Sequence, residues 1–519
     1  MSNGISRRAR RLGPGVAALA TVAIALAGGA AGARAAVPAT VSVAANTVTR
    51  PVAPDFLGLA LEFSTVPQWA GGGGPPAVLV NLIRNLTPNG HPSVRIGGLS
   101  TDRTWWPAPG VRRPAGVTYA LGPGWAETVT ALARALNARL ILGVNFEAND
   151  RGLAAAEARA FRATIPGRYL SAIDLGNEMP LYTSVPWYRV SGGTLLPWYA
   201  TGGQAVFSRS PSWGPIPFVR DYTRVLGALP PIPVAGPDTQ NIAFFGAYDR
   251  LLSPHSRVRM LTSHGYGLNT CVTNAHVPTY PTIAHLLTRY ALDDLLAGLS
   301  PSIALAHRNR ASFRIDEMGS VTCGGRPGVS DTMASALWAA QALFTVARAG
   351  VDGVNLHTYP GLPNALYDLN GPPGARTATV HPLYYGALLF ARAAPAGSRL
   401  AAISTRGPLT LRAWATAGPG RARHVLLVNA SPNQAAAVTL NLPRGAFASG
   451  SGQLQRLTAP DVRSRDGITL GGRSFGPVTA TGTLAAPRAN PVSPRGHGYR
   501  VWVPAGSAAL LTLMGPPTG

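Results

Sequence analysis

The stretch of sequence that decides the fold runs from residue 312 to residue 359. It begins with SFRIDEMGS (312–320), continues through DTMASALWAAQALFTVARAG (331–350) and ends with DGVNLHTY (352–359). The first and last runs are short and β-like, whereas the middle run has the length and periodicity of a helix. A helix between two buried strands predicts that the strands pair in parallel, because parallel strands need a long crossover connection.

The same alternation of short apolar runs and helical stretches extends back to residue 57. Residues 126–138 and 283–299 read as further helices. Six more strand-like runs precede the two already quoted: LGLALEFS (57–64), SVRIGGLS (93–100), ARLILGVNF (138–146), SAIDLGNE (171–178), IPVAGPD (232–238) and VRMLTSHGY (258–266). Eight such units predict an α/β fold of the (β/α)8 TIM barrel type. The alternative is a doubly wound open sheet, but no Gly-rich phosphate loop follows any strand.

The last part of the chain has a different pattern. Beyond about residue 390, β-type runs are punctuated by Gly, Pro, Asn and Ser, which is typical of a β-sandwich. We therefore expect a signal peptide at 1–36, a catalytic barrel at 37–390 and a β-sandwich domain at 391–519. The first strand of the 37–390 segment could join the sandwich instead of the barrel.

The N-terminus has the features of a secretory signal. A basic stretch, RRARR (7–11), precedes an apolar stretch at 15–32 and a small-x-small site, ARA (33–35). We expect a secreted protein, exported by the general secretory route rather than the twin-arginine route. No later segment is long and apolar enough to span a membrane.

Composition excludes several classes of protein. The net charge is +24, the basic residues are Arg rather than Lys, and they are scattered along the chain. Without a basic block interleaved with aromatics, we expect no nucleic-acid partner. A positive field favours acidic polymers, including uronic-acid glycans. Charged residues make up only 13% of the chain, which argues against a disordered polyelectrolyte.

The chain has two cysteines, Cys271 and Cys323. In an oxidising compartment two cysteines suggest one disulfide, and both follow predicted strand ends. The alternative is a pair of buried free thiols.

Glutamates gather at the predicted strand ends. The chain has six, and four of them lie at or near the ends of strands one, three, four and seven: Glu62, Glu147, Glu178 and Glu317. Active sites of such barrels form at those ends, and a carboxylate beside an apolar strand is costly unless paired or used. Glu178 and Glu317 would face each other across the barrel mouth, as the two carboxylates of a glycoside hydrolase do. The alternative is that either Glu pairs with a barrel Arg.

Several motifs together resemble one family. They are RIGGLSTDRTWW (95–106), DLGNEMP (174–180), TSHGYGLNTC (262–271), the block at 314–359 and HPLYYGALLFARA (381–393). They resemble glycoside hydrolase family 79, which belongs to a clan of retaining (β/α)8-barrel glycosidases and includes β-glucuronidases and heparanase. The resemblance extends from about residue 40 to the C-terminus.

The resemblance implies roles for individual residues. Glu178 would be the acid/base and Glu317 the nucleophile. Asn177 would bind the sugar 2-OH, and Tyr266 would orient the nucleophile, although Tyr266 could instead be a packing aromatic.

The resemblance also implies a site for a uronate carboxylate. Backbone N–H groups of Gly324 and Gly325 would bind it, since glycines allow close approach of the backbone to an anion. An ordinary tight turn is the alternative. Tyr367, with Tyr359 as second choice, would contact the same carboxylate.

Glu62 and Asp102 resemble carboxylates that bind sugar hydroxyls. Asp102 could instead pair with Arg95 or Arg103. His264 fits a structural role as well as a ligand-contacting one. No His/Cys cluster has metal-ligand spacing, so we expect no metal and no cofactor.

The sequence therefore predicts a secreted retaining glycoside hydrolase acting on β-glucuronides. Leu99 and Met179 depart from the common family pattern and bear on substrate identity. The alternatives are a barrel glycosidase acting on neutral β-glycosides and a non-catalytic glycan-binding protein. A basic structural protein is a further class, which predicts clustered charge and no convergent carboxylates.

Overall fold

The computed structural model describes residues 35–69, 74–88, 90–420, 422–443, 450–486, 488–496 and 498–514. The predicted signal peptide lies, up to residue 34, outside the described residues.

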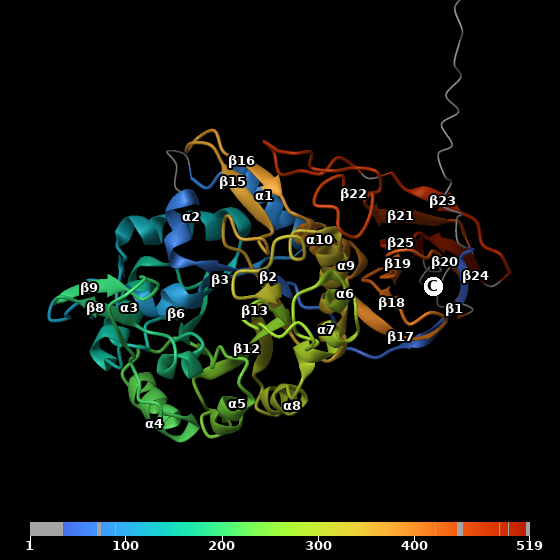
Figure 1. Cartoon of the computed structure of the whole chain (residues 1–519). Coiled ribbons are helices and arrows are strands. Elements are labelled where there is room, and N and C mark those ends of the chain that lie inside the picture. The colour runs from blue at the N-terminus through green and yellow to red at the C-terminus, as the bar shows by residue number, and fades with distance from the viewer. Residues whose placement is uncertain are drawn as a thin grey trace, which may run out of the picture. The chain divides into compact units, whose positions relative to one another are not determined.

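Eight parallel strands close into a barrel in the order β11-β12-β13-β14-β2-β3-β6-β7 (Figure 1). Leu57 pairs with Val354 where the first strand meets the last, and Glu62 pairs with Gly97 at the other end of the first strand. The predicted (β/α)8 barrel is confirmed, and each of the eight predicted strand runs overlaps a barrel strand. The barrel strands are β2 (Leu57–Glu62), β3 (Ser93–Gly97), β6 (Arg139–Val144), β7 (Leu170–Leu175), β11 (Val234–Gly236), β12 (Val258–Asn269), β13 (Ser312–Thr322) and β14 (Gly353–His357).

Helices follow the barrel strands and cover them. Because the strands are short and apolar and their connections are long, helices packed against the sheet are the way in which both of its faces become buried. Those the structure describes are α1 (Ala77–Leu86), α2 (Pro123–Leu136), α3 (Arg151–Thr164), α4 (Pro215–Leu226), α5 (Ile242–Tyr248), α6 (Ile283–Leu286), α7 (Tyr290–Asp293), α8 (Ser300–Arg308), α9 (Met333–Arg348) and α10 (Pro382–Ala393), with the 3₁₀ turns η1 (Phe63–Trp69), η2 (Gly98–Arg103), η3 (Met179–Thr183) and η4 (Asp294–Leu296).

The single helix predicted at 283–299 is wrong. The segment is broken into α6, α7 and η4. The break follows α6, where the Thr288 hydroxyl donates a hydrogen bond to the His285 carbonyl at 2.6 Å. Apolar periodicity does not reveal the position of this break.

Helices α9 and α10 connect the barrel to the C-terminal sheets. The Phe344 ring of α9 stacks on Trp414 with centroids 5.5 Å apart and meets Phe390 of α10 edge-on at 4.9 Å. Arg412 donates a hydrogen bond to Gln341 at 2.6 Å across the same contact. Nearly every residue of α9 is buried because the helix is covered on both sides. The two parts of the described chain from residue 36 onward therefore share one apolar core.

The C-terminal part is a two-layered β-structure, as predicted. Strand β17 pairs with β18 through Arg399 and Leu400 and then with β1 through residues 401–406, so it passes from one layer to the other. Its strands are β17 (Arg399–Arg406), β18 (Leu411–Ala417), β19 (Ala422–Asn429), β20 (Ala436–Asn441), β21 (Gly452–Thr458), β22 (Thr469–Leu470), β23 (Asn490–Val492), β24 (Gly498–Val503) and β25 (Ser507–Met514).

The first strand, β1 (Val37–Thr47), lies in this β-structure and not in the barrel. It pairs antiparallel with β17 and parallel with β20. Val41 and Val43 are buried in the core between the layers. The barrel itself begins at Leu57.

In the part of the chain that the structure describes, three small sheets lie outside the two main parts, and the sequence patterns did not predict them. They are β8 (Tyr188–Ser191), β9 (Thr194–Pro197) and β10 (Gln204–Val206) after the barrel strand β7; β4 (Thr104–Trp105) with β5 (Tyr119–Ala120); and β15 (Tyr367–Asn370) with β16 (Thr377–Val380).

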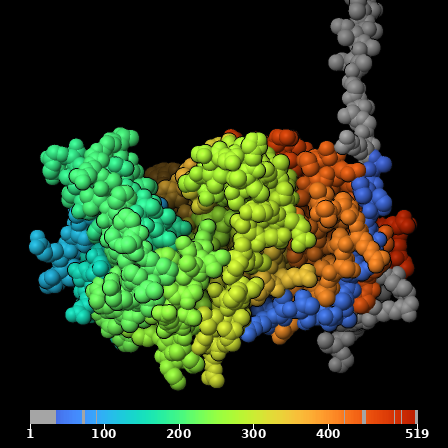
Figure 2. Space-filling view, turned by 60° about the horizontal axis from the view of Figure 1, so that its bottom comes forward, coloured from blue at the N-terminus to red at the C-terminus, as the bar shows by residue number. Residues whose placement is uncertain are grey.

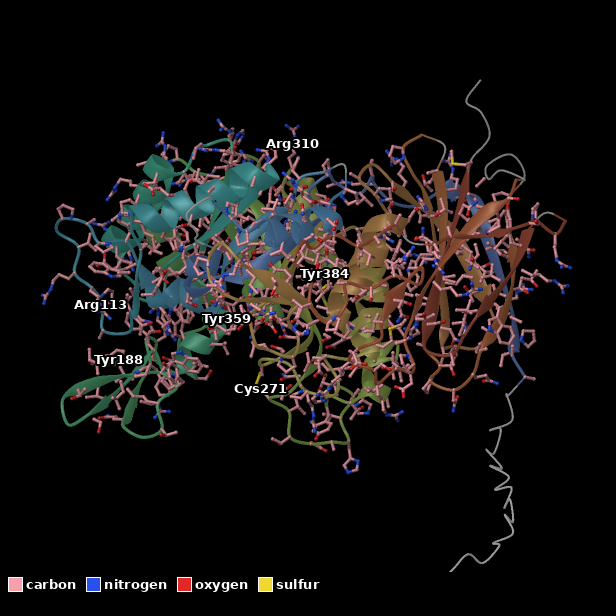
Figure 3. The ribbon with its side chains drawn as sticks, turned by 90° about the horizontal axis from the view of Figure 1, so that it is seen from above. Arg113, Tyr188, Cys271, Arg310, Tyr359 and Tyr384 are labelled. Carbon is pink, nitrogen blue, oxygen red and sulfur yellow. A yellow bond between two sulfur atoms is a disulfide. The ribbon has the colours of Figure 1, made fainter. Side chains whose placement is uncertain are left out.

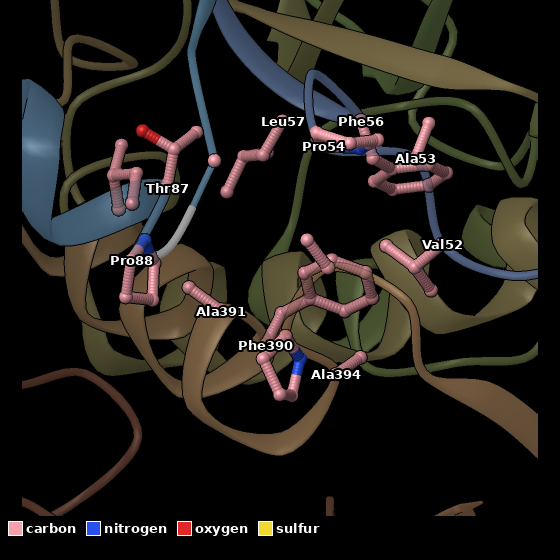
Figure 4. Close-up of a pocket in the computed structure, with 14 residues that line it drawn as sticks. Val52, Ala53, Pro54, Phe56, Leu57, Thr87, Pro88, Phe390, Ala391 and Ala394 are labelled. Carbon is pink, nitrogen blue, oxygen red and sulfur yellow. The ribbon is translucent and has the colours of Figure 1, made fainter. Parts of the chain in front are cut away.

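A small apolar cavity of about 20 Å³ lies at the start of β2, between Val52, Leu57 and Phe390 (Figure 4). The amino ends of barrel strands lie opposite the end where active sites form, so this cavity is not a candidate active site. Among the described residues, no helix combines the length and the hydrophobicity needed to cross a lipid bilayer.

Candidate active site

The carboxyl end of the barrel carries the candidate site. The segment with β8–β10 follows β7, and the segment between β12 and α6 follows β12, so both rise from this end of the barrel. Figure 2 shows a hollow between the green atoms of the first segment and the yellow-green atoms of the second. The predicted residues Glu62, Glu178 and Glu317 come from three barrel strands: Glu62 ends β2, Glu178 follows β7 by three residues, and Glu317 lies within β13.

Arg95 of β3 is the centre of the site's charge network, and its side chain is fully buried. Its guanidinium bonds Asp174 at 2.9 Å, Asp238 at 2.8 Å and Glu317 at 3.0 Å. It also lies 3.2 Å from Asp316. A guanidinium has five donors in a planar fork, which allows one residue to serve four carboxylates from three strands or strand ends.

Glu317 of β13 is surrounded by donors and positive charge. The Tyr266 hydroxyl donates to its Oε1 at 2.6 Å, and Arg95 donates to its Oε2. His357 Nδ1 lies 3.7 Å from the same Oε1. Burial raises the pKa of Glu317, but the charges of His264, His357 and Arg95 and the tyrosine hydrogen bond outweigh it and hold the pKa below its usual value. The carboxylate is therefore ionised.

Glu178 and Glu317 lie on opposite sides of one imidazole. His264 Nδ1 is 3.1 Å from Glu178 Oε1, and its Nε2 is 3.8 Å from Glu317 Oε2. Burial lowers the pKa of His264, but Glu317, Glu178 and Asp316 together raise it to about 9. The ring is therefore a buried cation at neutral pH. It contacts both predicted catalytic carboxylates, so the structure gives it more than a packing role.

The backbone at Glu178 is strained. Its φ of 45° and ψ of 51° lie in the left-handed region, which is rare for a residue with a side chain. Its N–H donates to the Asp238 carbonyl at 2.9 Å, and its carbonyl accepts from Leu181 at 2.8 Å. Gly176, with a φ of 83°, makes the preceding bend, and a Cβ there would meet the Tyr182 hydroxyl at 2.7 Å. The bend directs the Glu178 side chain, 26% exposed, out of the barrel wall.

Asn177 is fixed on both sides. Its Oδ1 accepts from Arg95 at 2.8 Å, and its backbone N–H donates to Asp102 at 3.1 Å. Because Arg95 donates to the side-chain carbonyl oxygen of Asn177, the side-chain NH₂ group of Asn177 points away from Arg95.

The predicted role of Asp102 as a sugar-binding carboxylate does not fit the structure. Its Oδ1 accepts from the backbone of Phe146 and Glu147, and its Oδ2 accepts from Asn177 and Tyr182. With protein donors on both oxygens and 2% exposure, the side chain has no room for a hydroxyl of a substrate. Asp102 instead connects three strand ends and positions Asn177. The alternative pairing with Arg95 or Arg103 is also not the one observed.

Glu62 lies beside Ser100 and His357. Its Oε2 accepts hydrogen bonds from the Ser100 backbone N–H and hydroxyl, and its Oε1 is 3.7 Å from His357 Nε2. Burial lowers the pKa of His357, but Glu317 and Glu62 raise it above its usual value. His357 also lies 3.1 Å from the Tyr266 hydroxyl, so it connects Glu62 to the Glu317 cluster.

Gly324 and Gly325 form the turn that follows β13, with φ values of 85° and 83°. Gly325 N–H donates to the Thr322 carbonyl at 3.4 Å, and a Cβ on Gly325 would meet the Asn364 backbone at 3.0 Å. The preceding residue, Cys323, forms a disulfide with Cys271, which ties this turn to the segment after β12.

Tyr367 does not lie where the sequence analysis placed it. It belongs to the β15–β16 hairpin and is 5% exposed within the apolar core. Burial raises the pKa of Tyr384, and the neighbouring Tyr367 adds to the rise; the Tyr384 hydroxyl donates to the Leu82 carbonyl of α1, outside the barrel. Tyr359, the second choice, is 37% exposed (Figure 3). The loop that follows Tyr359 packs on the Gly324–Gly325 turn through Leu362 and Asn364.

Three side chains, Asp238, His264 and Asp316, lie close enough to hold a metal ion, with ligand atoms within 4.8 Å of one another. Arg95 already bonds Asp238 and lies against Asp316, so a cation of the protein occupies this position. Burial raises the pKa of Asp316 and of Asp174, while Arg95 outweighs burial and lowers the pKa of Asp238. The donor set fits a network that shares protons around one arginine better than it fits a metal site.

Glu147, the remaining strand-end glutamate, is an ion-pair partner of Arg103. Ser208 donates to its other oxygen at 2.9 Å. Burial raises its pKa to about 7 in spite of the arginine. Of the four glutamates predicted at or near strand ends, Glu147 is the one that pairs with an arginine in the way the sequence left open as an alternative.

The sequence analysis did not predict that Arg95 lies at the centre of the charge network. It also did not predict that His357 connects Glu62 to the Glu317 cluster. Both belong to barrel strands, and a charged residue within the apolar run VRIG was a signal that could have identified Arg95.

Comparisons with known proteins agree with this description. Residues 413–510 match the family model described as the glycosyl hydrolase family 79 C-terminal beta domain. No curated protein matches the chain in sequence. The predicted resemblance to family 79 is confirmed by this match to the C-terminal domain.

Solved structures share the fold at low identity. A 4-O-α-L-rhamnosyl-β-D-glucuronidase from Fusarium oxysporum 12S has a TM-score of 0.67 at 20% identity, over 91% of this chain and 100% of that one. A GH51 arabinofuranosidase from Xanthomonas axonopodis pv. citri has a TM-score of 0.60 at 15% identity, over 92% and 100%. CelM2, a bifunctional glucanase-xylanase from a metagenome library, has a TM-score of 0.60 at 15% identity, over 93% and 99%.

Proposed function

We propose that the protein is a retaining glycoside hydrolase that cleaves β-glucuronide linkages. The observation that carries the proposal is the placement of Glu178 and Glu317 on either side of His264, with Glu317 held ionised by Arg95 and Tyr266. Two carboxylates in different environments are what double displacement requires.

In this mechanism Glu317 attacks the anomeric carbon and Glu178 protonates the leaving oxygen. The Tyr266 hydroxyl occupies Glu317 Oε1, which fixes the orientation of the carboxylate during attack. Water then enters, Glu178 removes its proton, and the glycosyl–Glu317 ester is hydrolysed with net retention. Asn177, whose Oδ1 is held by Arg95, presents its NH₂ to the sugar 2-OH.

The preference for a uronate rests on the turn after β13. Gly324 and Gly325 both have positive φ, which allows backbone N–H groups to converge on an anion. Tyr359, in the loop beside this turn, replaces Tyr367 as the tyrosine contacting the carboxylate. The family match and the glucuronidase among the structural neighbours support the same substrate class.

One observation favours a neutral β-glycoside instead. The Gly325 N–H already donates to Thr322 within the turn, which leaves less of the turn available to a carboxylate. A non-catalytic glycan-binding protein is disfavoured, since both carboxylates are retained in an intact network.

We further propose that the protein acts outside the cytoplasm. The disulfide between Cys271 and Cys323 is of a kind that persists in oxidising compartments, and it agrees with the predicted export signal.

The test is an assay of the protein from residue 37 onward on 4-nitrophenyl β-glucuronide beside the β-glucoside, β-xyloside and β-galactoside. Glu317→Gln is expected to lower kcat by about three orders of magnitude. Glu127→Gln, a change at an exposed position of α2, is the matched control. Turnover of a neutral glycoside in place of the glucuronide would overturn the uronate assignment and keep the two carboxylates.

A further inference from the structure

A groove of about 480 Å³ opens beside the barrel mouth. One wall is the loop at 113–118 and the other is the small sheet of β8 and β9. Figure 3 shows Arg113 and Tyr188 close together at this edge of the molecule, although they come from distant parts of the chain. The volume is that of a site for a small molecule or for part of a chain.

The groove exposes apolar and aromatic surface. Tyr199 is 70% exposed and Leu195 is 53% exposed, and Trp187 and Tyr188 line the groove beside them. Large apolar side chains gathered in one exposed place indicate a binding surface. Aromatic faces suit the C–H faces of sugar rings, since these are the apolar sides of an otherwise polar molecule.

The walls are fixed by the protein before any ligand binds. The Trp187 ring packs so tightly on Gly116 that a Cβ there would meet it at 2.3 Å. Arg189 of β8 donates to the Trp198 carbonyl at 3.1 Å and so holds the segment after β9 that carries Tyr199. Arg113 donates twice to the Val117 carbonyl, which places its cation at the groove.

The groove is connected to the acid/base by a short series of hydrogen bonds. Trp187 Nε1 donates to the Asp102 carbonyl at 3.0 Å, and the Asp102 carboxylate accepts from the N–H of Asn177, the residue before Glu178. In the proposed mechanism Glu178 protonates the leaving oxygen, so the leaving group lies on the Glu178 side of the cleaved bond.

We propose that this groove binds the leaving-group sugars of an oligosaccharide substrate, and that the natural substrate is a glycan chain rather than a glucuronide of a small alcohol. The inference rests on the proposed function, because it takes Glu178 as the acid. Tyr199 and Leu195 supply the stacking surface, and Arg113 favours an acidic substituent on these sugars.

The test compares a β-glucuronosyl-terminated tetrasaccharide with 4-nitrophenyl β-glucuronide as substrates. Tyr199→Ala is expected to lower kcat/KM on the tetrasaccharide by about threefold to tenfold, mostly through KM, since one lost aromatic contact is of that size. On the aryl glucuronide it should change kcat/KM by less than about twofold. Tyr290→Ala, a change at an exposed tyrosine of α7, is the matched control. Leu195→Ala should act in the same direction as Tyr199→Ala.

The outcomes distinguish a failure of the groove proposal from a failure of the proposed function. If the aryl glucuronide is cleaved but Tyr199→Ala and Leu195→Ala act on the tetrasaccharide no more than Tyr290→Ala does, the groove is not the leaving-group site. If only neutral aryl glycosides are cleaved, the uronate proposal fails and the same comparison is made with the matching neutral tetrasaccharide. If nothing is cleaved, calorimetric titration with the tetrasaccharide decides: equal binding by the wild type and by Tyr199→Ala overturns the inference, and weaker binding by Tyr199→Ala supports the groove alone.

Discussion

Arg95 Nη1 lies 3.0 Å from Glu317 Oε2, and the arginine side chain is fully buried. The same guanidinium bonds Asp174 and Asp238 and lies against Asp316. Burial alone lowers the pKa of an arginine, but these carboxylates raise it well above its usual value. The ionised state of Glu317, the proposed nucleophile, therefore depends on a fully buried arginine.

Removing this cation should destabilise the whole protein. Arg95→Met leaves buried carboxylates without a partner, and we expect a loss of about 3–5 kcal/mol in the free energy of unfolding. Arg220→Met removes an arginine whose side chain is 74% exposed, and this variant should change the free energy of unfolding by less than about 1 kcal/mol. Urea unfolding of the two variants is the measurement. Equal stability of the two would show that the Arg95 network contributes little.

The barrel could be predicted because its evidence is local. Eight short apolar runs, separated by helical stretches, leave few other ways of burying both faces of a sheet. The broken helix at 283–299 could not be predicted from periodicity, since the apolar pattern does not mark where the segment breaks.

The site could be predicted only in part. Glu178 and Glu317 were predicted at or near strand ends, and strand order alone brings their two strands together in the barrel. Asp102 and Tyr367 were placed differently by the sequence because side-chain direction depends on backbone geometry that residue types do not reveal. Asp102 turns inward to the backbone of Phe146, and Tyr367 turns into the core from a hairpin outside the barrel.

Tyr266→Phe should weaken the nucleophile and change its titration. The hydroxyl donates to the ionised form of Glu317 at 2.6 Å, so its loss raises the pKa of that carboxyl. We expect kcat/KM to fall by about tenfold to a hundredfold and the acidic limb of its pH profile to move to higher pH. A tyrosine that only packs would leave the limb where it was, and Tyr290→Phe, at an exposed site, should leave both unchanged.

His264 should make stability depend on pH above neutrality. Its pKa in the folded state is about 9, raised from the value of about 6.5 expected when unfolded. Its contribution is therefore fully present below pH 6.5 and is lost as the pH rises through 9. Between pH 7 and 9, the unfolding free energy of the wild type should fall more steeply than that of His264→Gln.

The control for this pH dependence is His424 of β19. Burial lowers its pKa to about 4, so it is neutral across the same range in the folded protein. His424→Gln should keep the slope of the wild type between pH 7 and 9. Parallel curves for the wild type and His264→Gln would contradict a charged imidazole between the two glutamates.

The disulfide should support both the fold and the turn at Gly324. Cys271 and Cys323 are 52 residues apart, and opening a loop of this size is expected to cost about 2–4 kcal/mol of stability. The double variant Cys271→Ser, Cys323→Ser should unfold at lower urea and show a higher KM for the aryl glucuronide. Dithiothreitol should shift the wild type toward the variant and leave the variant unchanged. A variant as stable as the wild type in both conditions would contradict this.

Glu178→Ala should separate the two steps of the proposed mechanism. With an activated leaving group such as 2,4-dinitrophenol no proton is needed, so Glu317 can still form the glycosyl ester, while hydrolysis lacks its general base. Added azide, which needs no base, should then raise the turnover and yield the β-glucuronosyl azide, with retention. The wild type and the exposed-site control Glu127→Ala should not respond to azide. If Glu178→Ala loses activity equally on good and poor leaving groups and ignores azide, Glu178 is not the acid/base, and its strained backbone and its contact with His264 need another explanation.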